Sequence, residues 1–265
     1  LLMPGPSHNL LASEFAQIHR YFFDGGRVMV LIDPGTPQRV LDFLAEYGVQ
    51  AGKDIIVDER HRLIGHDKFL ASVPTFTGLL RERLSAAAVF SLARTTLIAP
   101  DETTHDVSVD IFAATARESW AYMTEEDQPI PDTDVTFRPG TDHTGPLPVG
   151  AKVTAKSPSP TTGRIGQMLV FGDSDFATNE RLDHLGNKDL FLSSVALLAE
   201  DDSLVSMRQK SKVSRSALSP IWITERQASI IFWVAVIVQP LVCLLLGVLI
   251  IGVRTRRTNR NRAPS

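Results

Sequence analysis

The sequence predicts an α/β domain with a mostly parallel sheet, followed by one C-terminal transmembrane helix. Strand-like and helix-like stretches alternate up to about residue 58, an order typical of right-handed β–α–β crossovers. Within the segment 27–34, residues 28–32 are continuously apolar, as expected of a parallel strand buried on both faces. Residues 228–253 contain no charged residue, which indicates a membrane span.

Each further element follows from a local pattern. Ser13 is the expected N-cap of a helix over residues 14–23, and Gly48 is the expected stop of a helix over residues 37–47. Residues 61–78 are expected to form a loop, and residues 117–120 a turn or short helix. The remaining predicted elements are strands at residues 1–3, 54–58, 86–92, 149–155 and 165–171, and a helix from about residue 187 to residue 200.

The uncharged run 228–253 is long enough to cross a bilayer. At about 1.5 Å per helical residue it spans roughly 39 Å, against a hydrocarbon core of ~30 Å. The charges that follow it are all positive: Arg254, Arg256, Arg257, Arg260 and Arg262. The positive-inside bias therefore predicts a cytoplasmic C-terminus and an extracytoplasmic location for everything before residue 228.

Gln239 and Pro240 lie in the middle of this run. They predict either a kink with a hydrogen bond to a helix of a partner, or a bare kink with the amide bonded to its own backbone. Cys243, the only cysteine, also lies within the run. The preceding part of the chain therefore contains no disulfide and no thiolate metal site.

The predicted organisation has four parts. A domain covers residues 1–200, with an irregular Pro- and Gly-rich excursion at about 124–163, and a polar tether covers 201–227. The helix at 228–253 and a basic tail at 254–265 complete the chain. The chain begins like the end of a strand and is expected to have lost an N-terminal part. Of its 27 basic residues five lie in the tail, so 22 remain against 30 acidic residues, which excludes a nucleic-acid-binding face.

Acidic residues follow two predicted strands. Asp33 ends the strand at 27–34, while Asp173, Ser174 and Asp175 follow the strand at 165–171. Ligands of open α/β sheets bind beyond the carboxyl ends of strands. If the two strands are neighbours, Asp33, Asp173 and Asp175 could therefore converge on a cation such as Mg²⁺. The alternative is that they accept hydrogen bonds from turn amides and cap the following segments.

Other catalytic patterns are incomplete. Gly172 and Ser174 resemble part of the nucleophile elbow G-x-S-x-G, but Phe176 stands at the second glycine position. No phosphate loop or dinucleotide fingerprint is present. Four of the seven histidines are expected to be scattered loop or surface residues: His8, His19, His105 and His143.

Several short motifs together resemble a known family. They are Pro4-Gly5-Pro6, YFFDGG at 21–26, the segment 30–34, Gly48, Ser119-Trp120, Gly172 to Phe176 with Asn179, Gly186-Asn187-Lys188-Asp189, and the closing helix with its arginines. The chain resembles the auxiliary component of ABC-type transport systems related to the gliding-motility protein GldG. Where that family usually places an asparagine and a Trp-Leu pair in its last domain helix, this chain has Ser194 and 196–198.

The resemblance implies a fold similar to flavodoxin-like and glutamine-amidotransferase-like domains, without the amidotransferase cysteine. It implies a location in the bacterial inner membrane beside an ABC-2 type permease and an ABC ATPase. The expected function is that of a non-catalytic accessory subunit without a cofactor, whose outer domain binds a substrate, a glycan or a partner protein. The candidate ligand-binding residues are Asp33, Asp173, Ser174, Asp175, Asn179 and Asn187, and the candidate partner-helix contacts are Gln239 and Pro240. A membrane-anchored metal-dependent hydrolase using Asp33, Asp173 and Asp175 is the alternative.

Overall fold

The computed structural model describes residues 1–59, 68–99, 103–124, 135–199, 225–242, 244 and 247. These residues belong to two units, one formed by the residues up to 199 and one by those from 225 onward. The predicted tether before residue 225, the tail at 254–265 and the end of the apolar run at 248–253 lie outside the described residues.

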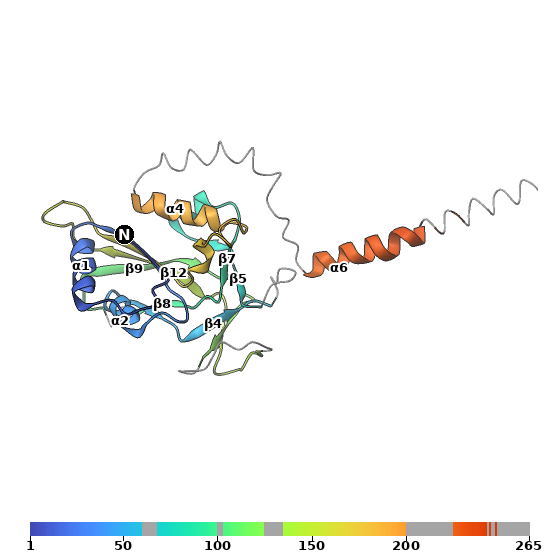
Figure 1. Ribbon diagram of the computed structural model, residues 1–265, viewed down its shortest axis with the longest axis horizontal. Helices are drawn as coiled ribbons and strands as arrows, with labels where there is room; N and C mark the ends of the chain where they lie inside the picture. Colours follow the sequence, from blue (N-terminus) through green and yellow to red (C-terminus); the bar gives the residue numbers. More distant parts are fainter. Residues whose placement is uncertain are drawn as a thin grey trace, which may run out of the picture. The chain divides into compact units, whose positions relative to one another are not determined.

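A six-stranded mixed sheet forms the centre of the first unit, in the order β1–β2–β13–β12–β9–β6 (Figure 1). Its strands are β1 (Leu2–Pro4), β2 (Arg27–Leu31), β13 (Gln167–Phe171), β12 (Pro148–Ala155), β9 (Val107–Ala114) and β6 (Thr75–Phe76). β1, β2 and β13 are paired in parallel, and the other pairings are antiparallel. Since β9 thereby runs in the same direction as β13, four of the six strands point one way. The predicted α/β class is confirmed.

Three small sheets flank the central one. They contain β11 (His143–Thr144), β10 (Trp120–Met123) and β4 (Asp54–Val57); β3 (Val49–Ala51) and β8 (Thr96–Ile98); and β5 (Leu70–Val73) and β7 (Ala88–Ser91). The strand predicted at 54–58 exists, but it pairs with β10 and not with the central sheet. The place beside β2 is taken by β13, which comes more than 130 residues later in the chain.

Two other local predictions were wrong, the loop at 61–78 and the N-cap at Ser13. The expected loop at 61–78 contains β5 and β6 among its described residues. The turn expected at 117–120 is present at 117–118 and leads directly into β10, and the strand expected at 149–155 is present as β12. Ser13 does not cap the first helix: Leu11 is the N-cap residue, and its backbone amide donates to the Glu14 carboxylate at 2.7 Å.

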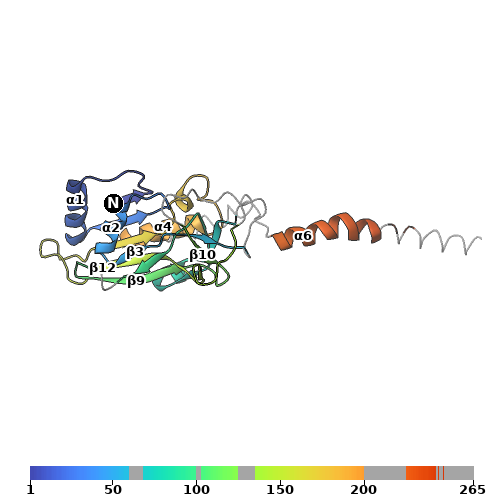
Figure 2. The ribbon, with the colours of Figure 1, turned by 90° about the horizontal axis from the view of Figure 1, so that it is seen from below.

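Helices cover both faces of the central sheet (Figure 1). They are α1 (Ala12–Phe23), α2 (Gln38–Glu46), α3 (Gly78–Arg83), a 3₁₀ turn η2 (Asp175–Ala177) and α4 (Asn187–Ala199). Alternate residues of β2, together with Ile32 directly after it, belong to two hydrophobic clusters. Val28, Val30 and Ile32 pack with α1 and α2, while Met29 and Leu31 pack with η2 and α4. Figure 2 shows the same layers from below, with β12 and β9 side by side. The continuous apolar pattern of residues 28–32 therefore has its expected cause, burial on both faces.

The second unit contains α6 (Glu225–Trp233), followed by a π-helical stretch (Val234–Val238). Pro240 lies just after this stretch and has no amide hydrogen to donate to the preceding turn, which accounts for the local change of helix type. Gln239 and Pro240 are both exposed. Within the described residues, no helix combines the length and the apolar character that crossing a membrane requires.

Candidate functional site

The carboxyl ends of β2 and β13 are neighbours, and they bring Asp33 and Ser174 together. The two strands are parallel neighbours, with Leu31 opposite Phe171. The Asp33 carboxylate accepts two hydrogen bonds from Ser174, one from the backbone amide at 2.8 Å and one from the hydroxyl at 2.7 Å. This pair joins positions 141 residues apart in the chain.

Asp173 is completely buried, and its carboxylate is hydrogen-bonded to the backbone around it. Its carboxylate accepts hydrogen bonds from the amides of Asp175 at 2.9 Å, Phe176 at 3.2 Å and Ser91 at 3.1 Å. It therefore caps η2 and ties that turn to β7. Burial raises the pKa of Asp173 well above its usual value, and the charges of Asp175 and Asp33 act in the same direction.

Asp175 is half-buried beside the same turn. Burial and the neighbouring charge of Asp33 raise its pKa. Asp33 and Asp173 both direct their oxygens to protein donors, which is the capping arrangement rather than convergence on a cation. Among the described residues, no group of three or more His, Cys, Asp or Glu side chains is placed to hold a metal ion.

Gly5 closes this edge of the sheet. It follows β1, has a positive φ of 56°, and its amide donates to the Leu31 carbonyl at 3.0 Å. A Cβ atom at this position would lie 2.6 Å from Asp33 Oδ2 and 2.7 Å from Ser174 Oγ. The Pro-Gly-Pro motif thus places bare backbone directly against the Asp33–Ser174 pair.

The two predicted asparagines differ. Asn187 is buried and pairs with the backbone of Val89: its carbonyl oxygen accepts from the amide at 2.7 Å and its nitrogen donates to the carbonyl at 2.9 Å. Its nitrogen also donates to the Arg181 carbonyl at 3.0 Å. Asn179 is exposed. Asn187 therefore fastens the start of α4 to β7, and its amide is directed at that strand.

Sequence reasoning missed Arg94, a buried cation at this edge. Its guanidinium donates to the Gly52 carbonyl at 2.9 Å and to the Asp33 carbonyl at 3.1 Å. Its backbone amide donates to the Gly172 carbonyl at 2.8 Å. Burial lowers the pKa of Arg94. No local pattern distinguishes Arg94 from other loop arginines, because its partners come from three distant segments.

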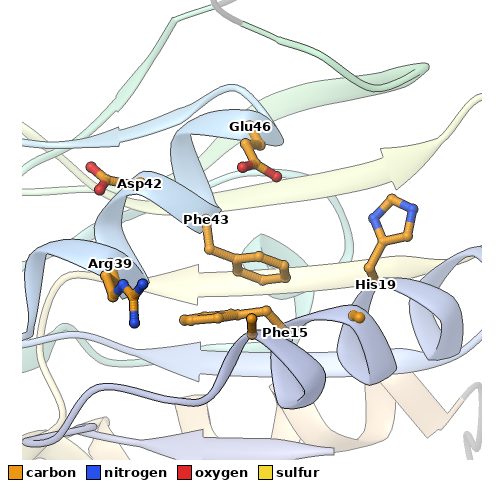
Figure 3. Close-up of a pocket in the computed structure, with 8 residues that line it drawn as sticks. Phe15, His19, Arg39, Asp42, Phe43 and Glu46 are labelled. Carbon is orange, nitrogen blue, oxygen red and sulfur yellow. The ribbon is translucent and has the colours of Figure 1, made fainter.

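A groove between α1 and α2 is the candidate binding site that the sequence did not indicate (Figure 3). Its volume is about 500 Å³, within the range of ligand sites. Phe15 of α1 and Phe43 of α2 meet across it, with ring centroids 5.0 Å apart and planes inclined by 31°. The charged residues that line it are Arg39, Asp42 and Glu46, and His19 lies at one end.

Two histidines expected to be scattered instead meet beside this groove. The rings of His19 and His105 lie 4.7 Å apart, and His19 Nδ1 is hydrogen-bonded to the Tyr47 hydroxyl at 2.8 Å. His105 Nε2 is 3.5 Å from a Glu46 carboxylate oxygen. Burial and the nearby His105 lower the pKa of His19, whereas Glu46 opposes this shift. Burial, aided by the charge of Glu46, raises the pKa of the Tyr47 phenol.

Comparison with known proteins shows a similarity of fold to a solved structure and no match in sequence. No protein-family model matches the chain, and no curated protein matches it. Among solved structures, the chain is similar to the mmIFT52 N-terminal domain, with a TM-score of 0.54 and 17% sequence identity. The match covers 76% of this chain and 77% of that one. At this identity the likeness concerns the α/β architecture.

Proposed function

We propose that the chain is a non-catalytic accessory subunit of an ABC transport system of the ABC-2 type, related to GldG. In this proposal the helix at 228–253 anchors the chain in the bacterial inner membrane with its tail in the cytoplasm. The α/β domain lies outside the cytoplasm and binds a substrate, a glycan or a partner protein. The permease and the ATPase of the system are the expected partners.

The observation that carries the proposal is the uncharged run followed by five arginines, attached to an acidic α/β domain. The described part of that run is helical up to residue 242, and its large apolar side chains are exposed. Such a surface needs an apolar environment or a partner to cover it. The resemblance to the GldG-related family supplies the transport context.

The bonding at the carboxyl edge supports a role without catalysis. A catalytic carboxylate needs a free oxygen directed at the reacting atoms. Asp33 and Asp173 instead accept hydrogen bonds from Ser174, Asp175, Phe176 and Ser91. These bonds favour a binding domain over the hydrolase that uses Asp33, Asp173 and Asp175.

Affinity purification tests the proposal directly. The tagged full chain, extracted from native membranes with mild detergent, is expected to co-purify with a multi-helix permease and an ATPase. Recovery of neither subunit, with the chain itself intact and abundant, would remove the main support for an ABC accessory role. A variant lacking residues 228–265 serves as the control for retention through the membrane anchor.

Calorimetry distinguishes the hydrolase alternative. Titration of the full chain with Mg²⁺, Mn²⁺ or Ca²⁺ is expected to give no saturable heat at millimolar concentrations. Saturable binding that disappears in Asp33→Asn would favour the hydrolase. Asp33 is the residue to substitute because it is partly exposed, whereas Asp173 is completely buried.

A further inference from the structure

The ring of His105 contacts both α1 and the end of α2. Its centroid lies 4.7 Å from that of His19, 4.8 Å from that of Tyr47 and 5.7 Å from that of Phe23. Tyr47 is completely buried, whereas His19, Phe23 and His105 are partly exposed. These four residues, which we call the histidine cluster, join α1, the end of α2 and the segment 103–106 that precedes β9.

The segment 103–106 is fastened to its surroundings by the ring of His105 and by a few polar contacts. The amide and the hydroxyl of Thr104 both donate to the Glu46 carbonyl, at 3.1 and 3.4 Å. Asp106 forms an exposed ion pair with Lys156 at 3.1 Å, and its carbonyl accepts a hydrogen bond from the Lys156 amide at 3.1 Å. Exposed ion pairs contribute little to stability, so the ring of His105 is a major contact between this segment and the helices.

The neutral and protonated forms of His19 differ in how they can bond Tyr47. His19 Nδ1 lies 2.8 Å from the Tyr47 hydroxyl. A neutral imidazole can accept at Nδ1, and the hydroxyl hydrogen then lies between the two atoms. A protonated imidazole can only donate, so the hydroxyl hydrogen must turn into the buried surroundings of Tyr47. Protonation of His19 is therefore costly in this arrangement.

A second proton in the cluster is harder to accommodate than the first. A proton at His105 lies near the Glu46 carboxylate, which is 3.5 Å from His105 Nε2 and can neutralise it. A further proton at His19 places two positive rings 4.7 Å apart. Burial and His105 accordingly lower the pKa of His19, while Glu46 opposes this shift. The other charged residues of these elements are exposed: Glu14, Arg20 and Asp24 on or next to α1, Arg39 and Asp42 on α2, and Asp106 with its partner Lys156.

We propose that the histidine cluster is an acid-sensitive latch. At neutral pH the latch is closed, with His19 bonded to Tyr47 and the ring of His105 packed against both. As the pH falls below about 6.5, protons at His19 and His105 favour an open arrangement, in which the segment 103–106 leaves the helices and the central sheet stays folded.

Opening changes the surface at one end of the groove between α1 and α2. His19 lies at that end (Figure 3), and its ring is 4.8 Å from Phe23 and 6.1 Å from Tyr47. Departure of His105 uncovers these two aromatic residues, so acid enlarges the apolar surface beside the groove. The latch does not depend on the proposed transport role, since it requires contacts within the domain alone.

Hydrogen–deuterium exchange of the full chain in a non-ionic detergent measures the opening. One histidine that titrates at the ordinary pKa of 6.5 in the open state raises the open population at most about tenfold between pH 7.5 and 5.5. Protection of the Thr104 amide, relative to an unstructured chain at the same pH, is therefore expected to fall by about three- to tenfold. No fall would overturn the proposal.

An amide of the central sheet distinguishes local opening from global unfolding. The Ile32 amide donates to the Phe171 carbonyl at 2.9 Å, between β2 and β13. Its protection is expected to remain at least about a hundredfold higher than that of Thr104 at both pH values, because the sheet stays folded when the latch opens. Equal protection of the two amides would mean that they exchange through the same unfolding event, and would overturn the latch.

Two matched histidine variants assign the pH dependence to the cluster. His19→Gln retains a side chain that can bond the Tyr47 hydroxyl but takes up no proton, and it should limit the fall in Thr104 protection to about twofold or less. His143→Gln removes an exposed histidine of β11 and should leave the fall unchanged. High protection of Ile32 at pH 7.5 verifies that each variant is folded. An undiminished fall in His19→Gln would overturn the proposal.

Two further variants test the pairing of the histidines. His105→Phe keeps an aromatic ring against Tyr47 without a second proton, and should give about half the fall in Thr104 protection seen in the unmodified chain. Glu46→Gln removes the carboxylate near His105 Nε2, and should lower Thr104 protection at pH 5.5 about twofold further. A response unchanged in both variants would mean that His19 acts alone, and would overturn the paired latch.

Discussion

The carboxyl edge of the sheet and the α1–α2 groove use their polar side chains in opposite ways. At the carboxyl edge, Asp33, Asp173 and Asn187 are bonded to the protein's own backbone and hydroxyl groups. In the groove, Arg39, Asp42 and Glu46 are exposed around an aromatic floor. A polar motif after a strand is thus a weak indicator of a site when the surrounding amides can use all of its oxygens.

The largest expected effect is at Asp173. Asp173→Ala leaves the buried amides of Ser91, Asp175 and Phe176 without their acceptor, and should lower the free energy of unfolding by about 3 kcal/mol or more. Urea denaturation measures the change. Asp173→Asn keeps one oxygen acceptor and is expected to lose less. A loss below about 1 kcal/mol for the alanine variant would mean that the edge is not held by this side chain.

Gly5 offers the next largest effect. Gly5→Ala puts a Cβ on a residue with positive φ and within 2.6 Å of Asp33 Oδ2, so stability should fall by about 2 kcal/mol. Gly35→Ala is the matched control, because a Cβ there meets nothing within 4 Å, and it should change stability by about 0.5 kcal/mol or less. Equal losses of stability in the two variants would show that a Cβ at Gly5 does not clash with Asp33 and Ser174.

Acidification should weaken the α1–α2 region through His19. The folded-state pKa of His19 is lowered, so the unfolded chain binds more protons below about pH 6.5, and folding stability is lost as pH falls through that range. The drop in unfolding free energy between pH 7.5 and 5.5 should be smaller in His19→Gln than in the unmodified chain. An identical drop in both proteins would show that His19 does not contribute.

The smallest expected effect is in the groove itself. Asp42→Ala removes an exposed carboxylate whose hydrogen-bond partner, Gln38, is also exposed, and should change stability by no more than about 0.5 kcal/mol. Urea denaturation of Asp42→Ala and Asp173→Ala in the same experiment compares their losses of unfolding free energy. A loss at Asp42 comparable to that at Asp173 would erase the distinction between the two regions.

The sequence predicted the elements with strong local signals. The apolar run of β2, the periodicity of α1, α2 and α4, and the strand before Gly172 all appear within a few residues of their expected bounds. It also placed Asp33 and the segment 173–175 at the carboxyl ends of two buried strands, which are neighbours in the structure. These features depend on a few neighbouring residues and on simple rules of sheet topology.

What the sequence could not provide was long-range pairing. The pattern of 54–57 is that of any buried strand, and nothing in it indicates that β10 rather than β2 is its partner. His19 and His105 lie 86 positions apart, and their contact depends on how the segment before β9 returns to α1. The groove is equally nonlocal, because Phe15 and Phe43 belong to different helices.

The position of β13 has a consequence for how the domain forms. This strand lies between β2 and β12, although among the described residues of the domain it is the last strand to be made. Until residues 167–171 arrive, β2 lacks its neighbour on one side and β12 lacks the strand that joins it to β2. Closing the sheet therefore requires contacts between segments about 140 residues apart, which slows folding and delays it until nearly the whole domain is available. A chain that ended before β13 would keep two buried strand edges unpaired, and such edges are sites of aggregation.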